Sequence, residues 1–188
     1  MKRFLLLMLC CIFSLSVSAQ EHQTFMGIPI DGSYASFVAQ LKAKGFKETS
    51  VGGADLEGQF SGSNRTVYVY CTPITEKVYR VTVTLHKSSS WSSLKSIYSE
   101  FKELLTNKYG EPFGGETFTQ PYYEGDGYEM TALLADKCNY TQIYSTESGR
   151  IMLWISKVFD GSVLLMYNDN INSDLNDAEQ SSIKYNDL

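Results

Sequence analysis

The sequence contains few of the residues and motifs on which enzymes and metal sites usually depend. Histidine occurs only twice, as His22 and His86, and there is no His-x-x-x-His or Cys-x-x-Cys pair to bind zinc. Residues 168–179 follow the spacing of a calcium-binding loop but lack its first aspartate and its central glycine. There is no Gly-x-Ser-x-Gly nucleophile motif and no standard phosphate-binding glycine loop. The sequence therefore assigns no catalytic residue, metal ligand or cofactor, and it favours a protein that is not an enzyme.

Basic residues are outnumbered by acidic ones, 16 to 21, which gives the chain a net charge of −5. Proteins that bind nucleic acid need a stripe of Lys and Arg to contact the phosphates, and this sequence has none. An anionic membrane surface would also attract a basic segment rather than this composition. We therefore expect no nucleic-acid partner and no anionic lipid surface as a partner.

Long hydrophobic runs are absent except at the start of the chain. Met1-Lys2-Arg3 precedes an apolar run over residues 4–13, and the small-x-small pattern Val17-Ser18-Ala19 follows it. This arrangement predicts an export signal, residues 1–19, that is cleaved after Ala19. The run is shorter than the roughly 20 residues that span a bilayer. We therefore expect a periplasmic or secreted protein with no transmembrane segment after cleavage, and loss of the two basic residues of the signal would lower its net charge to −7.

Cysteine occurs four times, and two of these residues would leave with the export signal. Cys71 and Cys138 remain in the mature chain. In an oxidising compartment they could form one disulfide, or each could serve as a small buried hydrophobic residue. The sequence leaves both alternatives open.

Two segments have the apolar spacing of amphipathic helices. The first helix is expected over residues 33–44, with Ser33 as its N-cap and Gly45 as its stop signal. Phe46 is then expected to fold back on the last turn. The second helix is expected over residues 91–109, after three consecutive serines.

Alternating apolar and polar residues predict two groups of antiparallel strands. The expected strands are 58–61, 65–71 and 78–86 in the first group, and 140–146, 150–158 and 163–167 in the second. Asp160-Gly161 predicts a tight two-residue hairpin between the last two strands. We expect residues 111–130 to be mostly loop, residues 128–135 to form a short helix or strand, and the acidic tail 169–188 to form a short helix or to fray.

The predicted elements describe a single α+β domain over residues 20–168, in which a helix followed by an antiparallel meander occurs twice. The two units would span residues 25–87 and 88–168. Their helices match at a constant offset, which pairs Tyr34 with Tyr98 and Leu41 with Leu105. Any two amphipathic helices would share part of such a pattern, so an accidental match is the alternative.

The repeated helix and meander, together with the motifs that flank the first helix, resemble a large group of uncharacterised secreted bacterial proteins. Those motifs are Gly27-Ile28-Pro29-Ile30-Asp31-Gly32 before the helix and Gly45-Phe46 after it. The fold of that group is similar to the β-lactamase inhibitor protein. The resemblance implies one curved antiparallel sheet with helices on one face. It implies no inhibition of a β-lactamase, because a fold does not carry a function.

Aromatic residues at the polar positions of the alternating strands are the strongest functional signal. Tyrosine occurs 13 times, and several of these residues alternate with the aliphatic residues of the predicted strands. We expect them to share the face not covered by helices with Thr82 and Thr84, and the candidate binding residues there are Tyr68, Tyr70, Arg80, Tyr140, Tyr144 and Trp154. Tyr and Trp offer large rigid contact areas with a hydrogen-bonding end. The alternatives are ordinary cross-strand pairs, or burial beneath residues 111–130.

These observations favour an exported, non-catalytic binding or interaction protein of the bacterial cell envelope. It would dock a protein or glycan partner, of unknown identity, on the tyrosine-rich sheet face. The alternative is an exported hydrolase or small-ligand-binding protein with an unrecognised site, for which His86 is the available base. An assembly factor that uses its acidic tail or a sheet edge is a third reading.

Overall fold

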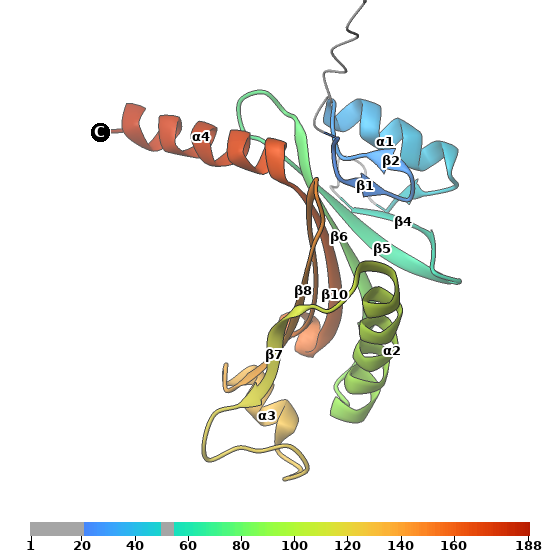
Figure 1. Cartoon of the computed structure of the whole chain (residues 1–188), viewed down its shortest axis with the longest axis vertical. Coiled ribbons are helices and arrows are strands. Elements are labelled where there is room, and N and C mark those ends of the chain that lie inside the picture. Colours follow the sequence, from blue (N-terminus) through green and yellow to red (C-terminus); the bar gives the residue numbers. More distant parts are fainter. Residues whose placement is uncertain (1–20, 50–54) are drawn as a thin grey trace, which may run out of the picture.

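An antiparallel sheet of eight strands forms the centre of the molecule within residues 21–49 and 55–188, the part of the chain that the computed structural model describes (Figure 1). The strand order is β3-β4-β5-β6-β10-β9-β8-β7. The strands are β3 (Lys47–Glu48), β4 (Asp55–Phe60), β5 (Ser63–Cys71), β6 (Val78–Lys87), β7 (Phe113–Phe118), β8 (Cys138–Ser145), β9 (Gly149–Ser156) and β10 (Ser162–Asp169). The predicted α+β class with a large antiparallel sheet is confirmed. The predicted export signal lies outside the described residues.

A small two-stranded ribbon forms a separate sheet that packs against the large one, with the Phe25 ring 5.3 Å from that of Tyr167 on β10. It pairs β1 (Thr24–Phe25) with β2 (Ile28–Pro29). In the large sheet the strands run outward from the central β6–β10 pair, through β5, β4 and β3 on one side and through β9, β8 and β7 on the other. Helix α1 precedes the first of these groups along the chain, and helix α2 precedes the second.

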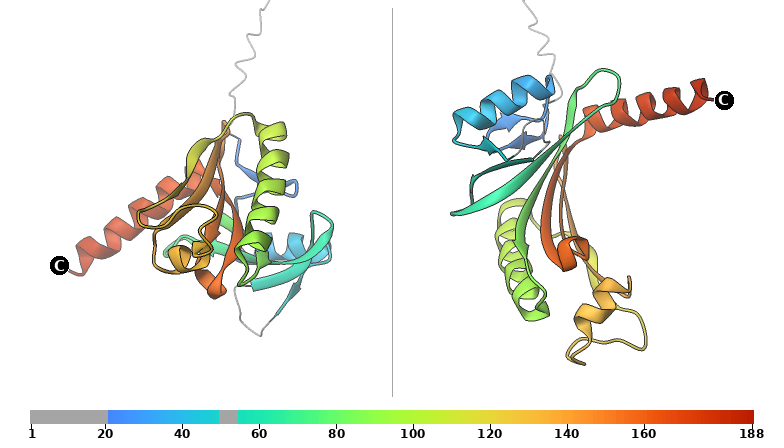
Figure 2. Two further views of the ribbon diagram at one scale, coloured as in Figure 1. Left: turned by 90° about the horizontal axis from the view of Figure 1, so that it is seen from below. Right: turned by 180° about the vertical axis from the view of Figure 1, so that it is seen from behind.

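Two helices bury one face of the sheet, and that packing forms the hydrophobic core. Helices α1 (Tyr34–Ala43) and α2 (Trp91–Tyr109) lie on the same side of the strands (Figures 1 and 2). The strand residues facing them are aliphatic and buried, including Leu56, Val67, Val69, Val81, Val83, Leu85, Ile151, Leu153, Ile155, Val163 and Leu165. Each such side chain contributes about 1.5–3 kcal/mol when it is fully buried. Alternation along each strand therefore separates a core face from an open face.

The ends of the two predicted helices are confirmed. Ser33 is the N-cap of α1, and its side-chain oxygen accepts a hydrogen bond from the Ser36 amide at 3.3 Å. Beyond α1, the Phe46 amide donates to the Leu41 carbonyl at 3.1 Å, and the Phe46 side chain is buried. Helix α2 covers the predicted residues 91–109 and ends at Gly110. These boundaries are encoded locally by cap residues, which is why the sequence predicts them well.

Strand β7 was not expected, because residues 111–130 read as loop. Gly114 and Gly115 lower the intrinsic preference of this segment for a strand. Pairing with β8 along six residues nevertheless holds it in the sheet. A side chain at position 114 would have a Cβ atom 2.1 Å from the Thr141 carbonyl oxygen, so glycine is what allows this close approach. Helix α3 (Glu129–Leu134) follows, in agreement with the helical option for residues 128–135.

The predicted tight hairpin at Asp160-Gly161 is wrong. Strand β9 ends at Ser156, before the predicted end at residue 158, and a longer connection with a 3₁₀ turn at Val158–Asp160 follows. Phe159 and Asp160 both have φ near +60°, and Gly161 has φ of 129°. The wider turn places Val158 and Phe159 outside the core, where they are 48% and 52% exposed.

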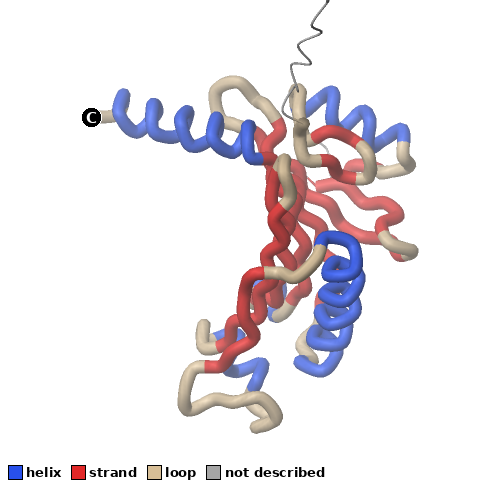
Figure 3. The backbone as a smooth tube through the Cα atoms, viewed as in Figure 1, coloured by secondary structure: helices blue, strands red, loops and turns tan. Residues whose placement is uncertain are grey.

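The acidic tail forms helix α4 (Asn170–Asn186), which begins where β10 ends. It contacts β6 and β10 and projects away from the side that carries α1 and α2 (Figures 2 and 3). Glu179 anchors the helix to the loop between β5 and β6. Its carboxylate accepts hydrogen bonds from the Ile74 amide at 2.6 Å and from the Thr75 amide at 3.2 Å.

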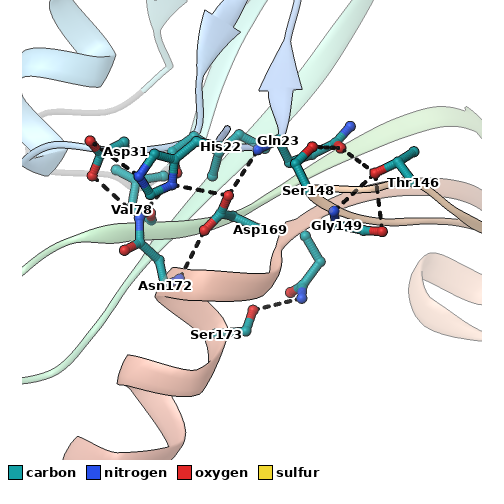
Figure 4. Close-up of polar contacts among 12 residues, drawn as sticks. His22, Gln23, Asp31, Val78, Thr146, Ser148, Gly149, Asp169, Asn172 and Ser173 are labelled. Atoms are coloured by element: carbon teal, nitrogen blue, oxygen red, sulfur yellow. Dashed lines mark hydrogen bonds and ion pairs between the residues drawn. The ribbon is translucent and has the colours of Figure 1, made fainter. Parts of the chain in front are cut away.

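A buried carboxylate joins the two ends of the domain. Asp169 is fully buried and is the N-cap of α4, where it accepts a hydrogen bond from the Asn172 amide at 2.8 Å (Figure 4). Its other oxygen accepts the Gln23 amide at 2.8 Å and lies 3.1 Å from His22 Nδ1. Gln23 also accepts hydrogen bonds from Thr146 and Ser148 through its side-chain oxygen. Asp169 thus fastens the first described residues to the junction of β10 and α4.

Replacing Asp169 with asparagine is expected to lower the free energy of unfolding by about 1–3 kcal/mol, because the new amide group cannot accept the hydrogen bonds that one carboxylate oxygen now accepts. Urea denaturation of the purified mature protein measures this change. Asp177→Asn, on the exposed part of α4, is the matched control and should stay within about 0.5 kcal/mol of the wild type. Equal urea midpoints for the Asp169→Asn variant and the wild type would contradict the proposed tie.

Candidate binding groove

The sheet face opposite α1 and α2 carries a hydrophobic groove. Side chains of β5, β6, β9 and β10 line it, and Val158 and Phe159 from the connection before β10 complete it. Its volume is about 350 Å³, which is the size of a small ligand site or of a pocket for one or two large side chains. The strand residues that line it are Tyr68, Tyr70, Arg80, Thr82, Thr84, Met152, Trp154, Leu164 and Met166.

The register of the strands arranges the open face in three rows that run across the sheet. The first row is cationic and polar, and it consists of Tyr70, Arg80, Asn168 and Arg150. The second row is mostly apolar, and it consists of Tyr68, Thr82, Met166, Met152 and Ile143. The third row consists of Thr66, Thr84, Leu164, Trp154 and Thr141. The groove therefore changes from polar to apolar along the strand direction.

The aromatic residues of the groove differ in how much solvent they meet. Tyr70 is 41% exposed, whereas Tyr68 and Trp154 are half-buried. Burial, with the nearby Asp55 carboxylate and Tyr70, raises the pKa of the Tyr68 phenol above its ordinary value, so that ring is neutral near pH 7. The Lys87 ammonium lies 3.9 Å from the centre of the Phe159 ring. This cation–π contact fixes one wall of the groove.

Four of the six predicted binding residues meet in the groove, namely Tyr68, Tyr70, Arg80 and Trp154. Tyr140 and Tyr144 do not, and their placement on the same face is a correction. In the β8–β9 pairing Thr141 lies opposite Trp154, so the alternate residues of β8 point to the helix side. Tyr140 and Tyr144 are only 2% and 1% exposed.

Hydrogen-bond partners under α2 explain why two tyrosines occupy the core positions of β8. The Tyr144 hydroxyl donates to the Lys102 carbonyl at 3.1 Å, and the Tyr140 hydroxyl donates to Glu124 at 3.0 Å. A buried phenol is stable where its hydroxyl is bonded in this way. The prediction instead placed both tyrosines on the polar side of the strand, opposite its aliphatic residues.

Sequence reasoning missed the apolar part of the groove. Met152, Leu164 and Met166 come from strands in which nearly every residue is apolar, so alternation does not show which of them faces outward. Phe159 was missed because its positive φ, which directs the turn, is unusual for an aromatic residue. Apolar residues occur at both odd and even positions of β10. This pattern was the available signal for a sheet that is apolar on both of its faces.

A polar pocket of about 250 Å³ adjoins the groove at its first row. Arg80 lines both cavities. Its Nε donates to Asn168 Oδ1 at 3.1 Å, and Asn168 Nδ2 donates to Ser173 Oγ of α4 at 2.6 Å. The pocket is also lined by Arg150 and by Asp174 and Asp177 of α4. The first turns of α4 therefore border the polar end of the open face.

The residues considered for chemistry or for metal binding are engaged elsewhere. His86 Nε2 lies 2.8 Å from Ser93 Oγ at the start of α2. The residues with calcium-loop spacing lie at the end of β10 and on helix α4, where Asn172 donates to two backbone carbonyls and Glu179 anchors a loop. Among residues 21–49 and 55–188, no cluster of three or more His, Cys, Asp or Glu could hold a metal ion.

Cys71 and Cys138 are free thiols, so the alternative of a disulfide between them is contradicted. Cys71 ends β5 and Cys138 begins β8, and three strands lie between these two. At ~4.8 Å per strand, the offset across the sheet alone separates their backbones by roughly 19 Å, and their positions near opposite ends of the strands add to it. A disulfide requires Cα atoms within about 7 Å. Sequence alone could not show this, because the separation depends on the order of strands in the sheet.

Both thiols should react slowly in the folded protein. Burial raises the pKa of Cys71 to about 11 and that of Cys138 to about 12, in each case with help from a nearby glutamate, so little thiolate forms near pH 8. At pH 8, Ellman's reagent is expected to react with two thiols per molecule of mature protein in denaturant and with far fewer in the folded protein. A mature protein that shows thiols only after addition of a reductant would refute the separation of these residues.

The described part of the chain has no helix that combines the length and the apolar character needed to cross a bilayer. Comparison of the chain with protein-family models, with curated proteins and with solved structures found no match. Function is therefore inferred from the groove and from the sequence.

Proposed function

We propose that this chain is an exported, non-catalytic binding protein of the bacterial cell envelope that docks a partner protein on the open face of its sheet. The observation that supports the proposal is the groove on that face. It is apolar, it is not covered by α1 or α2, and it is lined by Tyr68, Tyr70, Trp154 and Arg80. Uncovered apolar surface of this kind usually marks an interaction site.

The composition of the groove favours a protein partner over a glycan. Tyr, Trp and Arg are the residue types that contribute most binding energy at protein interfaces. The remaining lining includes Met152, Met166 and Leu164, which suit apolar side chains better than sugar hydroxyls. Methionine is flexible and can adapt to partners of different shape. A glycan would need more hydrogen-bonding side chains than the apolar rows provide.

The location of the protein is proposed from the first residues of the sequence. The positive start, the apolar run over residues 4–13 and the small residues before Gln20 support export to the periplasm or to the exterior. The binding face is mostly aromatic and aliphatic, with Arg80 as the charged residue of the groove, and the chain is negative overall. Both features are consistent with a partner that is neither nucleic acid nor an anionic membrane.

We also propose that the two halves of the domain are related units. Helix α1 is followed by β3, β4, β5 and β6, and helix α2 is followed by β7, β8, β9 and β10. The two sets meet at the central β6–β10 pair. This order supports the tandem arrangement proposed for residues 25–87 and 88–168, and with it the resemblance to secreted bacterial proteins with a fold similar to the β-lactamase inhibitor protein.

An exported hydrolase is the alternative, and one contact favours it. The 2.8 Å distance between His86 Nε2 and Ser93 Oγ is within the range of a base and its nucleophile. A catalytic pair of this kind also needs a third group that orients the histidine. No hydrogen bond from a carboxylate to His86 is found within the described residues, so the contact more simply joins β6 to α2.

Replacing the groove aromatics should abolish partner capture. We expect the mature protein, immobilised and exposed to envelope extract, to retain a partner that a Tyr68→Ala, Tyr70→Ala, Trp154→Ala variant loses. Because residues of these types often contribute 1–2 kcal/mol or more at an interface, binding of the recovered partner should weaken at least about tenfold. Affinity is then measured with that purified partner by calorimetry.

A matched control keeps this experiment specific. Tyr123 and Tyr128 are 61% and 64% exposed on the segment before α3, outside the groove. A Tyr123→Ala, Tyr128→Ala variant should bind the partner like the wild type. Circular dichroism must show that both variants are folded. A partner that the groove variant retains with unchanged affinity would refute the groove as the docking site.

A further inference from the structure

Two arginines lie in one line across the sheet at the polar end of the open face, and one of them, Arg80, also lines the groove. Arg80 on β6 lies opposite Asn168 on β10, and Asn168 lies opposite Arg150 on β9. All three side chains line the polar pocket. We call these three residues of the first row, Arg80, Asn168 and Arg150, the cationic row. Asn168 stands between the two guanidinium groups, and its amide is held by Arg80 and by Ser173.

The charges of the cationic row are not neutralised by ion pairs. Neither Arg80 nor Arg150 forms an ion pair within the described part of the chain, although Asp174 and Asp177 line the same pocket. Apart from the bond from Arg80 Nε to Asn168, the described residues provide no hydrogen bond to either guanidinium. Guanidinium groups bind carboxylates through paired N–H···O bonds. This face therefore offers donors for an acidic group on an otherwise acidic protein.

The spacing of the rows defines the shape of the ligand. Residues that are two positions apart on a strand point to the same face, so successive rows lie roughly 6.8 Å apart. The second row, with Met152 and Met166, is therefore about 7 Å from the cationic row, and the third row, with Leu164 and Trp154, is about 14 Å from it. An extended peptide repeats its side chains with the same two-residue period.

We propose that the docking segment of the partner is an extended peptide with an acidic side chain at one position and large apolar side chains two and four positions away. The carboxylate binds the cationic row, and the two apolar side chains occupy the second and third rows. This inference rests on the proposed function and adds the chemistry and orientation of the partner. The acidic group orients the peptide, and the apolar groups supply most of the buried area.

Charge complementarity is the reason for an acidic peptide. The chain as a whole is negative, so an acidic partner is repelled by most of its surface and attracted at the cationic row. A basic peptide lying along the strands would meet Arg80 at the end of the groove and Arg150 beside it, because the aspartates of the polar pocket, Asp174 and Asp177, lie on α4 rather than on the sheet. A neutral peptide would offer the guanidinium groups only uncharged acceptors, which form weaker hydrogen bonds than a carboxylate does.

The test compares synthetic peptides that differ only in having a carboxylate or an amide on one side chain. The probe is the acetylated and amidated peptide Gly-Asp-Ser-Leu-Ser-Phe-Gly, and its twin has Asn in place of Asp. A second pair has the reverse order, because the rows do not set the direction of the peptide. Binding is followed by NMR through the indole signal of Trp154, with that of Trp91 as an internal reference, since Trp91 packs in the core under α2.

We expect the Asp peptide of at least one pair to shift the Trp154 signal and to bind about tenfold more tightly than its Asn twin, as hydrogen bonds to a charged group imply. In an Arg80→Gln, Arg150→Gln variant the two twins should bind equally. Lys44→Gln, which removes an exposed cation at the end of α1, is the matched control and should preserve the tenfold difference.

The outcomes separate this inference from the proposed function. Twins that bind the wild type equally, with binding lost in a folded Tyr68→Ala variant that keeps the Trp154 probe, would overturn the inference and leave the groove as a docking site. Peptides that leave the Trp154 signal unchanged at millimolar concentration would also overturn it, while capture of the natural partner tests the groove independently. A tenfold preference that survives in the folded arginine variant would overturn the assignment of the cationic row.

Discussion

Burial of one sheet face against two helices stabilises the fold. The aliphatic side chains of β5, β6, β9 and β10 lose contact with water only because α1 and α2 cover them. The same strands have an opposite face that these helices cannot reach (Figure 2). On that face the strand alternation places Tyr68, Trp154 and two methionines, together with Arg80. The groove is thus a direct consequence of packing on the other side, and the strand register determines which side chains share it.

Asp169 connects this packing to the polar end of the groove. The residue before it, Asn168, belongs to the cationic row, and the residues after it form the first turn of α4. By accepting hydrogen bonds from Gln23 and Asn172, the buried carboxylate holds the junction of β10 and α4 against the first described residues. This tie sets the position of Asn168 between two arginines without any contact to the groove itself. Stability of the domain and geometry of the polar end are therefore coupled through one residue.

The helix ends could be predicted from the sequence because they are encoded locally, by Ser33 at the start of α1 and by Gly110 after α2. Tyr68, Tyr70 and Arg80 could be predicted because polar and apolar residues alternate clearly along β5 and β6. The positions of Tyr140 and Tyr144 could not, since the face of each depends on how β8 pairs with β9 and on hydroxyl partners far along the chain. Strand β7 and the turn at Phe159 likewise depend on neighbouring strands rather than on local preference. The separation of Cys71 from Cys138 follows from strand order, which no local pattern reveals.

Tyr68, Tyr70 and Trp154 line an open face, whereas Tyr140 and Tyr144 are sealed beneath α2. Hydroxyl-radical footprinting of the mature protein, read by mass spectrometry, measures the accessibility of these rings directly. The structure predicts rapid oxidation of Tyr70 and measurable oxidation of Tyr68 and Trp154, with Tyr140 and Tyr144 oxidised several-fold more slowly. Equal rates for all five rings, or faster oxidation of Tyr140 and Tyr144, would contradict the assignment of the two faces and remove the basis for the groove.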